Sequence, residues 1–378
     1  MMNILFICGS LEPGKNGVGD YVRLFASELI KKNVNVSLLS LKDKNTTHIL
    51  EDEQYIDNVY IKTLRIPQRE KLNKLDKEKI FAFIKKTTPE WISLQFVPYA
   101  YHTKGIPLNL ARTIKPFIIN SNVHIMYHEL WVEDKDIKGI FLSCLQKISI
   151  IMLKILLRPK ISHTHVPLYM KRLRKIGIRS SSLPLFSNIK ISNKMKNAHK
   201  VGDTNFTIGF FSQVTYRKEI FSFLSDLALD LSSHNIKANI LIIGGNEDKV
   251  LNLVNEFEPF RDLFKEIIST GYLDENDISL ALQQCDLGIS PVPQHLLGKS
   301  GSVAGFFEHG IPVAAPFIKT RYSHLGIGFF ENNLKEAIVI KPSFKSIKFA
   351  KKKALHARNI INPHAITLQF LEDINKYN

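Results

Sequence analysis

Residues 298–313 read GKSGSVAGFFEHGIPV, and this stretch decides the fold. It begins as a polar loop, continues as an apolar run typical of a buried helix, and reaches Gly310, which ends the helix before a short strand. Ser300 or Ser302 can cap the helix, which leaves free backbone N–H groups beside Lys299. Such a helix start favours an anion, above all a phosphate or diphosphate, whereas an ordinary Ser-capped helix is the alternative.

The sequence just before this stretch strengthens the anion prediction. Residues 285–291, CDLGISP, are typical of a strand that ends there. Ligands of open α/β folds bind at the carboxyl ends of strands. Further outward, the second half of the chain alternates predicted strands and helices: strands at 206–211, 238–245, 267–272 and 287–290, helices at 219–232 and 275–284, and Lys-rich helices at about 343–358 and 364–377.

The first half of the chain shows the same alternation. Residues 3–8 are an all-apolar strand of the parallel-sheet kind, followed by a glycine-containing loop, a helix at about 21–32 and a strand at 34–40. The loop glycines at 14, 17 and 19 do not match the dinucleotide-binding fingerprint, which disfavours a nicotinamide cofactor. Further strands are predicted at 59–64, 91–97, 123–129 and 161–166.

These patterns predict an α/β protein with two doubly wound, Rossmann-like domains that face each other across a cleft. The polar, Lys- and Asn-rich residues 189–205 are predicted to be the linker. We therefore expect an N-terminal domain at 1–188 and a C-terminal domain at 206–362. The last helix, 363–378, is expected to pack back toward the N-terminal domain.

Composition indicates a soluble globular protein of 378 residues, 44% hydrophobic and 23% charged. Three widely separated cysteines, no signal-peptide core at the N-terminus and no uncharged stretch of membrane-spanning length together predict a cytoplasmic location. The net charge of +16 indicates a polyanionic partner or surface, among which nucleic acid, anionic lipid and nucleotide-sugar phosphates remain open.

The chain resembles nucleotide-sugar-dependent glycosyltransferases of GT-B architecture, and more closely their large retaining family 4. The resemblance covers nearly the whole chain. It rests on five local motifs whose order and spacing together are fairly specific: NGVGDY at 16–21, YHE at 127–129, IGFFS with RK at 208–218, STGYL at 269–273 and HGIPV at 309–313.

The resemblance implies that the domain at 1–188 binds the acceptor and that the domain at 206–362 binds the nucleotide sugar. It also implies roles for particular residues. His128 would lie beside the transferred sugar, as a hydrogen-bonding group or a proton acceptor, although a packed structural histidine is the alternative. The implied donor-binding residues are Ser212, Arg217, Lys218, Gly271, Tyr272, Lys299, Ser300, Gly301 and Ser302. The implied acceptor-binding residues are Gly17, Gly19, Asp20 and Glu129. For Asp20 we favour a helix cap over acceptor binding.

The chain also departs from the family pattern. The family's two glutamates, eight positions apart, fall on Leu297 and Gly305, and Glu308 lies three positions too late. Donor identity and the retaining mechanism are therefore less firmly implied. An arginine that often accompanies the donor lysine falls on Ser212, so that Lys299, Arg217 or Lys218 would supply the cation.

No metal site is predicted, because no Asp-x-Asp pair stands at a strand end to hold a divalent cation. No cofactor is predicted either, since the nucleoside-diphosphate sugar, with UDP or GDP as its nucleotide, would be a substrate. His163 and His165 alternate on a strand and face one side, and we interpret them as structural or as lining the cleft. Preorganised cations and N–H groups stabilise the charge that develops on a leaving diphosphate.

Residues 137–157 form a predicted apolar helix with basic residues at its margins, and a second basic cluster follows at 171–175. Such a helix can lie on an anionic membrane surface. A core helix of the first domain is the alternative, which we favour for most of its apolar face.

The sequence thus predicts a cytoplasmic, peripherally membrane-bound glycosyltransferase that acts on a glycan or lipid-linked acceptor in polysaccharide, lipopolysaccharide or glycolipid synthesis. A sugar-nucleotide epimerase of the same architecture is one alternative. A non-catalytic nucleic-acid-binding protein is the other, although no aromatic residues are interleaved with the basic runs, and we expect no nucleic-acid partner.

Overall fold

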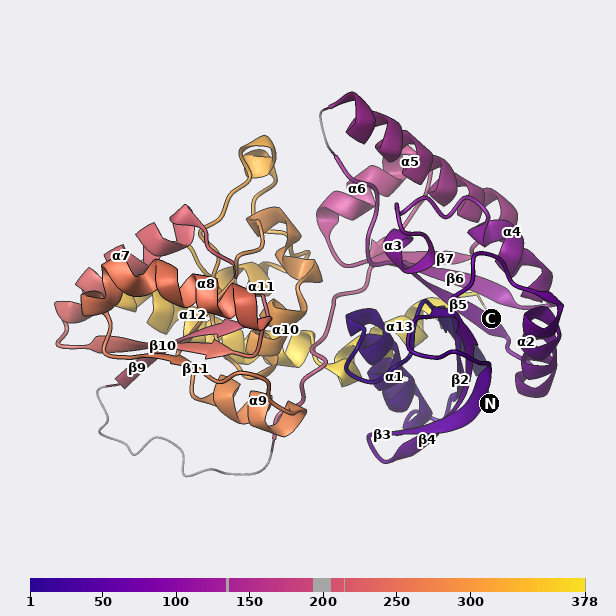
Figure 1. Ribbon diagram of the computed structural model, residues 1–378, viewed down its shortest axis with the longest axis horizontal. Helices are drawn as coiled ribbons and strands as arrows, with labels where there is room; N and C mark the ends of the chain where they lie inside the picture. The colour runs from indigo at the N-terminus through magenta and orange to yellow at the C-terminus, as the bar shows by residue number, and fades with distance from the viewer. Residues whose placement is uncertain (134–135, 193–204, 214, 378) are drawn as a thin grey trace. The chain divides into compact units, whose positions relative to one another are not determined.

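The computed structural model describes residues 1–133, 136–192, 205–213 and 215–377. The chain forms two compact units (Figure 1). Unit 1 consists of Met1–His165, Tyr169–Leu183 and Thr367–Asn378, and unit 2 of Val166–Leu168 and Pro184–Ile366. Residues 193–204 of the predicted linker lie outside the described residues.

Unit 1 is built on an eight-stranded sheet in the order β3-β4-β2-β1-β5-β6-β7-β8. All neighbouring strands are parallel except β3 and β4. The strands are β1 (Asn3–Cys8), β2 (Asn35–Asp43), β3 (Leu50–Ile56), β4 (Val59–Pro67), β5 (Trp91–Phe96), β6 (Asn122–Tyr127), β7 (Ile161–Thr164) and β8 (Ser181–Ser182). The order reverses between β1 and β5, as in doubly wound folds.

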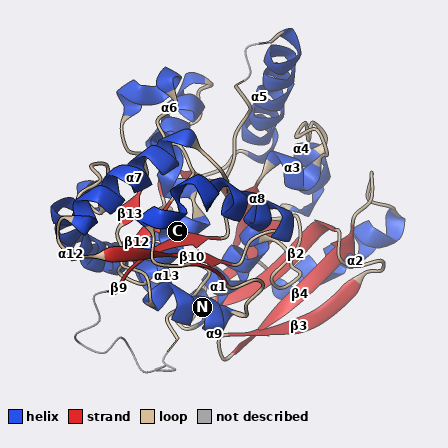
Figure 2. Ribbon diagram, turned by 60° about the vertical axis from the view of Figure 1, so that its left-hand side comes forward, coloured by secondary structure: helices blue, strands red, loops and turns tan. Residues whose placement is uncertain are grey.

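The strand predicted at 59–64 is β4, but the sequence interpretation missed β3 and the hairpin that it forms with β4. It lies at the edge of the larger sheet (Figure 2). Its turn residues, Asp57 and Asn58, both adopt positive φ values, 52° and 67°. An Asp-Asn pair with two positive φ angles is a typical two-residue hairpin turn, and this was the available signal.

The helices of unit 1 are α1 (Gly17–Ile30), α2 (Lys74–Thr87), α3 (Pro98–Tyr101), α4 (Leu110–Ile114), α5 (Ile137–Leu157) and α6 (Pro167–Lys175), with a 3-10 turn at Lys115–Phe117. The first two residues of α6 are assigned to unit 2, and the rest of this helix belongs to unit 1. α1 begins four residues earlier than predicted because the Asn16 side chain accepts hydrogen bonds from the N–H groups of Val18 and Gly19. α2 begins with a reciprocal capping box between Asn73 and Asp76.

The last helix, α13 (Pro363–Asn375), joins unit 1 through its final residues, although it is far from the rest of that unit in sequence. Phe370 on α13 is fully buried. Its ring packs against Phe25 on α1 at 5.1 Å and against Phe6 on β1 at 6.3 Å. α13, yellow in Figure 1, therefore lies against the core formed by the first strand and helix.

Helix α5 leaves much of its apolar surface exposed. Ile137 is 87% exposed, Phe141 66% and Ile155 60%, whereas its buried positions include the polar Ser143 and Gln146. The preference for a core helix was therefore wrong for this face. α5 also has the length and composition of a helix that could cross a membrane. Of the 18-residue segment of α5 that meets this criterion, 33% is buried inside the protein.

Unit 2 contains a six-stranded parallel sheet in the order β11-β10-β9-β12-β13-β14. Its strands are β9 (Asn205–Phe211), β10 (Lys237–Ile243), β11 (Ile267–Ser269), β12 (Leu287–Ile289), β13 (Val313–Ala314) and β14 (Ile338–Val339). Its helices are α7 (Lys218–Ser232), α8 (Glu247–Phe257), α9 (Glu275–Gln283), α10 (Gly301–Glu308), α11 (Asn332–Glu336) and α12 (Phe344–Ile360). Three 3-10 segments, η2 (Glu258–Leu263), η3 (Gln294–Lys299) and η4 (Thr320–Leu325), complete the unit. The predicted α/β class with two doubly wound sheets is confirmed.

Two glycines allow α10 to pack closely on this sheet. A Cβ atom on Gly288 of β12 would lie 2.5 Å from the ring of Phe306, which is fully buried. A Cβ on Gly209 of β9 would lie 3.3 Å from the same ring and 2.5 Å from the Cys285 sulfur. The close packing fixes the position of α10, and with it the helix start predicted to bind an anion.

Candidate functional site

The carboxyl ends of β9 and β12 lie side by side at the point where the strand order of unit 2 reverses. The two loops that follow these strands are joined directly. Arg217, just before α7, donates a hydrogen bond from Nε to the Pro291 carbonyl at 2.9 Å. Its guanidinium group lies 3.9 Å from the centroid of the Phe317 ring. Arg217 thus ties the loops together, in addition to its predicted role as a phosphate contact.

The start of α10 confirms the predicted cap. Ser300 is the N-cap, and its hydroxyl accepts from the Val303 N–H and lies 3.0 Å from the Ser302 hydroxyl. Both serines are buried, whereas Lys299 at the end of η3 is partly exposed. A Cβ on Gly301 would meet no atom within 4 Å, so the space before the first turn is open. The helix start can therefore receive an anion.

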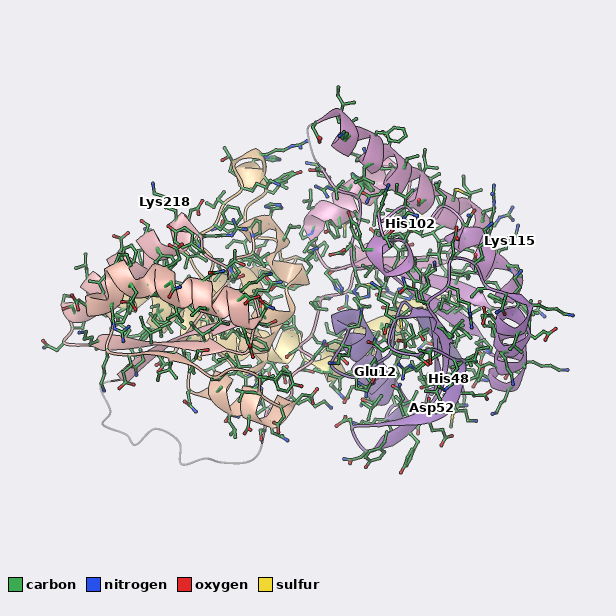
Figure 3. The ribbon with its side chains drawn as sticks, in the orientation of Figure 1. Glu12, His48, Asp52, His102, Lys115 and Lys218 are labelled. Carbon is green, nitrogen blue, oxygen red and sulfur yellow. The ribbon has the colours of Figure 1, made fainter. Side chains whose placement is uncertain are left out.

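The other predicted donor residues also follow carboxyl strand ends. Lys218 is the exposed first residue of α7, labelled in Figure 3. Ser212 follows β9 in a left-handed conformation, with φ 61°. Gly271, φ 64°, and Tyr272, 95% exposed, follow β11, which β10 separates from β9. The topology therefore places Ser212, Arg217 and Lys218 next to the β12 loop, and Gly271 and Tyr272 toward one edge.

The two positions where the family carries glutamates are filled with packed residues. Leu297 is buried. A Cβ on Gly305 would lie 3.0 Å from the ring of Phe211, which occupies the space that a longer side chain would need. A carboxylate at position 305 would therefore require repacking around Phe211, whereas position 297 holds a buried apolar side chain where the family has an acidic one.

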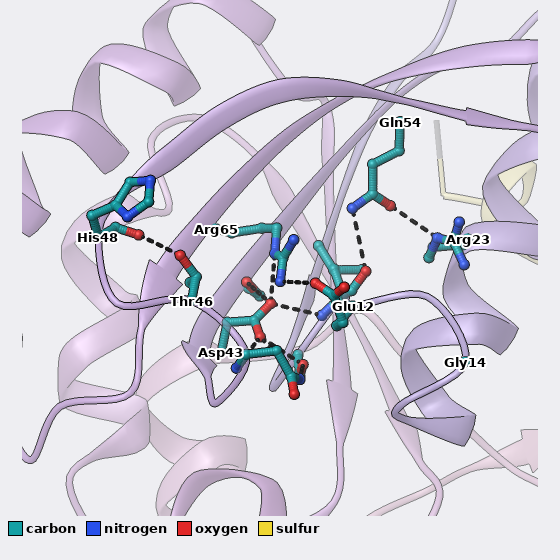
Figure 4. A network of polar contacts seen from close by, with 12 residues as sticks. Glu12, Gly14, Arg23, Asp43, Thr46, His48, Gln54 and Arg65 are labelled. Atoms are coloured by element: carbon teal, nitrogen blue, oxygen red, sulfur yellow. Dashed lines mark hydrogen bonds and ion pairs between the residues drawn. The ribbon is translucent and has the colours of Figure 1, made fainter.

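In unit 1 a buried ion pair holds the loop that follows β1 (Figure 4). The Asp43 carboxylate accepts from the Ser10 hydroxyl at 2.9 Å, the Leu11 N–H at 3.0 Å and Arg65 Nε at 2.8 Å. Arg65 also contacts Glu12 at 2.5 Å. Burial alone would raise the pKa of Asp43, but the hydrogen bonds led by Arg65 hold it at about 2. At neutral pH the loop is thus held by an ionised carboxylate.

The predicted acceptor-binding residues lie at the start of α1. Gly17 and Gly19 were predicted to lie in a loop, but they belong to the first turn of α1. A Cβ on Gly19 would lie 2.4 Å from the Ser10 carbonyl oxygen, so this glycine permits a close backbone approach. Asp20 accepts from the Gly14 N–H at 3.0 Å and from Arg23 at 3.2 Å. Because Asn16 is the cap, the favoured capping role of Asp20 is wrong.

His128 follows β6 and is 6% exposed. Both of its ring nitrogens are engaged, Nε2 with Gln95 Oε1 at 2.8 Å and Nδ1 with His165 Nε2 at 2.9 Å. The Tyr21 ring lies edge-on at 5.3 Å. Direct acceptance of a substrate proton by His128 therefore requires one of these two contacts to break. Glu129, the next residue, is half-buried.

His128 belongs to a longer buried array, which we call the histidine chain. Consecutive members are 2.8 to 3.1 Å apart. Their order is the Leu183 carbonyl, His165, His128, Gln95, Ser93, His124, His163 and the Asp373 carboxylate. Burial lowers the pKa of His124 well below its usual range, and the neighbouring His163 and His128 lower it further. All members lie in unit 1.

The sequence analysis did not identify Gln95, Ser93 or Asp373. Ser93 and Gln95 alternate along a buried strand, where polar residues on one side were the available signal. Asp373 lies 210 residues from its partner His163, which no local pattern reveals. Among the described residues no group of three or more His, Cys, Asp and Glu side chains is arranged to hold a metal ion.

No protein-family model and no curated protein sequence matches the chain. Solved structures do match it over nearly its full length. Anabaena HepE in complex with UDP-glucose has 14% identity and a TM-score of 0.59, with 100% of both chains covered. WaaG, a glycosyltransferase involved in lipopolysaccharide biosynthesis, has 11% identity and a TM-score of 0.55, with 98% of this chain and 99% of the other covered.

A putative UDP-N-acetylglucosamine 2-epimerase from Listeria monocytogenes is similar to the same degree. It has 10% identity and a TM-score of 0.58, with 99% of this chain and 96% of the other covered. At these identities the likeness concerns the fold, which glycosyltransferases and an epimerase share. The chain therefore has the GT-B fold that its sequence predicted, with the donor-binding candidates at the carboxyl edge of the second sheet.

Proposed function

We propose that this protein is a glycosyltransferase that moves a sugar from a nucleoside-diphosphate sugar to an acceptor. The observation that supports this most strongly is the carboxyl edge of unit 2, where Lys218, Lys299 and the Ser300-capped start of α10 follow adjacent strands. In this proposal the diphosphate lies between the two lysines, with the α10 N–H groups and the Ser302 hydroxyl as further donors.

These groups also account for the chemistry of transfer. As the bond between the sugar and the diphosphate breaks, negative charge grows on the leaving oxygens. Fixed cations and N–H groups stabilise that charge without reorganisation. Retention of the anomeric configuration is the outcome that the resemblance to family 4 favours. HepE in complex with UDP-glucose suggests UDP as the first nucleotide to test, with GDP as the second.

The test is calorimetric titration of the full-length protein with UDP and GDP. Lys299→Ala or Lys218→Ala should each weaken binding by about 1.5–3 kcal/mol, roughly 10- to 150-fold, the range of a charge-assisted hydrogen bond. Lys237→Ala is the matched control, because Lys237 starts β10 at the opposite, amino edge of the same sheet. Unchanged affinity in both site variants would contradict the assignment.

The proposed transfer does not depend on a metal ion. The described residues at this edge provide lysines, hydroxyl groups and a helix N-terminus, rather than the paired carboxylates that hold a divalent cation. Sugar transfer should therefore continue at an unchanged rate in excess EDTA. A loss of activity that manganese or magnesium restores would overturn this part of the proposal.

We further propose that the acceptor is lipid-linked and that the enzyme works at the cytoplasmic face of a membrane. The exposed apolar face of α5 is bordered by Lys138 and Lys154, both exposed. Next to this helix, unit 1 has a groove of about 850 Å³ that Leu145 of α5 helps to line. Apolar residues such as Phe117 form much of its wall, and basic residues such as Arg112 border it, a combination that suits an amphiphilic anion. His102, labelled in Figure 3, also lines the groove.

The epimerase alternative is supported by one specific observation, the similarity to the Listeria protein. An epimerase converts a free sugar nucleotide and needs no acceptor. Incubation with UDP-N-acetylglucosamine alone, followed by analysis of the sugar, separates the two functions. Formation of the 2-epimer would favour the epimerase.

A further inference from the structure

The groove of about 850 Å³ lies entirely within unit 1 and carries an excess of positive charge. Its volume is within the range of sites that hold one small molecule. A single carboxylate, that of Glu70, lines it together with five cations: Lys42, Arg69, Lys71, Lys77 and Arg112. Within the described part of the chain, only Arg69 of these five forms an ion pair. The groove therefore presents cations that the protein itself does not neutralise.

Lys42 is the cation whose surroundings point most clearly to an anion. It is half-buried near the carboxyl end of β2 and has no ion-pair partner among the described residues. The next residue, Asp43, lies on the other face of the strand, where its carboxylate accepts from Arg65 at 2.8 Å. Burial lowers the pKa of Lys42, and the charge of Glu70 offsets this effect only in part. A partly desolvated cation without a countercharge is unfavourable, and a bound anion would stabilise it.

Arg69 is oriented by a buried carboxylate. Its Nε lies 3.3 Å from Asp76 Oδ2, and Asp76 is completely buried at the start of α2. The same oxygen accepts from the Asn73 N–H at 2.9 Å, which fixes it further. The Nη groups of Arg69 have no hydrogen bond to the described residues, and the side chain is 40% exposed. The guanidinium group is thus held through Nε, and its two Nη groups can donate to an oxyanion.

The rest of the groove is apolar and includes a packed pair of rings. Phe81 of α2 and Phe117 of the 3-10 turn pack edge to face, with ring centroids 4.9 Å apart. The other apolar residues that line the groove are Leu41, Leu72, Leu108, Leu110, Pro116 and Leu145. An inorganic anion would leave this wall in contact with water, whereas a hydrocarbon chain would cover it. The lining therefore suits a molecule that has both an anionic group and a chain.

The apolar lining continues onto the exposed face of α5. Leu145 lines the groove, and Phe141 and Ile148 lie on the same side of the helix, about one turn before and after it. Both of these residues are exposed, and both belong to the face that is proposed to contact the membrane. The groove is thus adjacent to the surface from which a lipid chain would reach it.

We propose that this groove binds the lipid-linked acceptor, with a phosphate group of the lipid at Lys42 and Arg69 and the adjoining part of its chain along the wall formed by Phe81 and Phe117. A phosphate offers more acceptor oxygens than a carboxylate and so matches several cations at once. That the ligand is the acceptor rests on the proposed glycosyltransferase function. The affinity of the groove for a lipid phosphate does not, and it is measured without any donor.

The first measurement is calorimetric titration of the full-length protein with dodecyl phosphate below its micelle concentration. We expect dodecyl phosphate to bind about tenfold more tightly than dodecyl maltoside, which has the same chain and an uncharged head group. Inorganic phosphate, which has no chain, should bind more weakly still. Octyl phosphate should lose about fourfold in affinity for each methylene group that its shorter chain no longer buries.

The second measurement repeats the titration on variants of the groove. Lys42→Met keeps an apolar stem of similar length and should weaken the binding of dodecyl phosphate about tenfold. Its matched control is Lys44→Met, because Lys44 is an exposed lysine that does not line the groove. Arg112→Glu reverses an exposed charge of the lining, so the fold should be unaffected, and it should weaken binding about threefold. Its control is Lys115→Glu, at an exposed position outside the lining that is labelled in Figure 3.

The outcomes separate this inference from the proposed function. Equal affinity for dodecyl phosphate and dodecyl maltoside would overturn the phosphate assignment, and unchanged affinity in both groove variants would overturn the location. Equally tight binding of laurate or of lauroyl lysophosphatidylglycerol would assign the groove to an ordinary membrane lipid and overturn the acceptor role. A protein that binds dodecyl phosphate in the groove but binds neither UDP nor GDP would confirm the lipid-phosphate site and contradict the proposed function.

Discussion

Glu308 shows at the scale of a single residue how burial changes the charge of a side chain. It lies on α10, and its Oε2 atom is buried without a hydrogen-bond partner among the described residues. Burial raises the pKa of Glu308 to about 7, although Arg358 and Lys190 oppose the rise. Near neutral pH this carboxyl group is therefore half protonated in the folded protein.

The raised pKa of Glu308 predicts that stability falls as the pH rises. The folded state binds this proton more tightly than the unfolded state, whose carboxyl group titrates near 4.5. Its contribution is therefore complete below about pH 4.5 and is lost as the pH rises toward 7. Glu308→Gln should remove this dependence and raise the free energy of unfolding at pH 8 by about 3 kcal/mol.

Urea denaturation followed by circular dichroism between pH 5 and 8 measures this effect. Glu256→Gln is the control, because Glu256 is an exposed glutamate of the same unit. It should leave the free energy of unfolding unchanged. If Glu308→Gln shows the same slope with pH as the unmodified protein, Glu308 is ionised in the fold.

At the scale of elements, α5 shows what periodicity predicts and what it leaves open. The bounds 137–157 were predicted correctly from the apolar repeat. The repeat does not say which face is covered, and the structure buries Ser143, Gln146 and Ser149 beside Ile150 and Leu153. A helix with apolar residues on most sides can turn either way, and the choice depends on α4 and the loops around it.

The exposed face of α5 predicts binding to anionic vesicles. Phe141→Glu or Ile148→Glu should weaken binding at least tenfold, because each places a like charge against the lipid and removes an apolar contact. Both residues are exposed, so the fold should be unaffected. Binding should also weaken in 1 M salt, where the Debye length is roughly 3 Å.

Flotation with neutral and anionic vesicles at low and high salt checks this prediction. Leu251→Glu on α8 is the matched control, because Leu251 is 61% exposed on a helix of unit 2. Equal binding to neutral vesicles would indicate apolar insertion without an electrostatic component. No binding to either vesicle would contradict the proposed membrane role and favour a soluble acceptor.

At the scale of the whole molecule, the alternation of strands and helices was sufficient to predict the fold. Buried runs such as 3–8 and 206–211 became the central strands of the two sheets. The donor candidates could be predicted because each follows a strand end, and parallel topology gathers such ends. The histidine chain could not be predicted, because Gln95, His163 and Asp373 meet only after three strands and the last helix have packed together.

The last helix predicts a large effect of a change near the end of the chain. Phe370→Ala would remove a fully buried ring that packs on Phe6 and Phe25, and should lower the free energy of unfolding of unit 1 by about 3–5 kcal/mol. The two tryptophans, Trp91 and Trp131, both lie in unit 1, so their fluorescence reports its unfolding. Leu368→Ala, at a partly exposed position of the same helix, is the control and should cost less than about 1 kcal/mol. Equal effects of the two variants would show that the buried ring contributes little.

The position of α13 also has a consequence for protein synthesis. Residues 184–366 of unit 2 are contiguous and are made before residues 367–375 of α13, so unit 1 lacks its closing helix until that segment has been synthesised. During the synthesis of the roughly 180 residues between Leu183 and Thr367, which takes on the order of 10–40 seconds at 5–20 residues per second, the surface around Phe6 and Phe25 remains uncovered on the nascent chain. The half of the protein that is made first is thus the half that matures last, and a chaperone that covers apolar surface would have that interval in which to bind it.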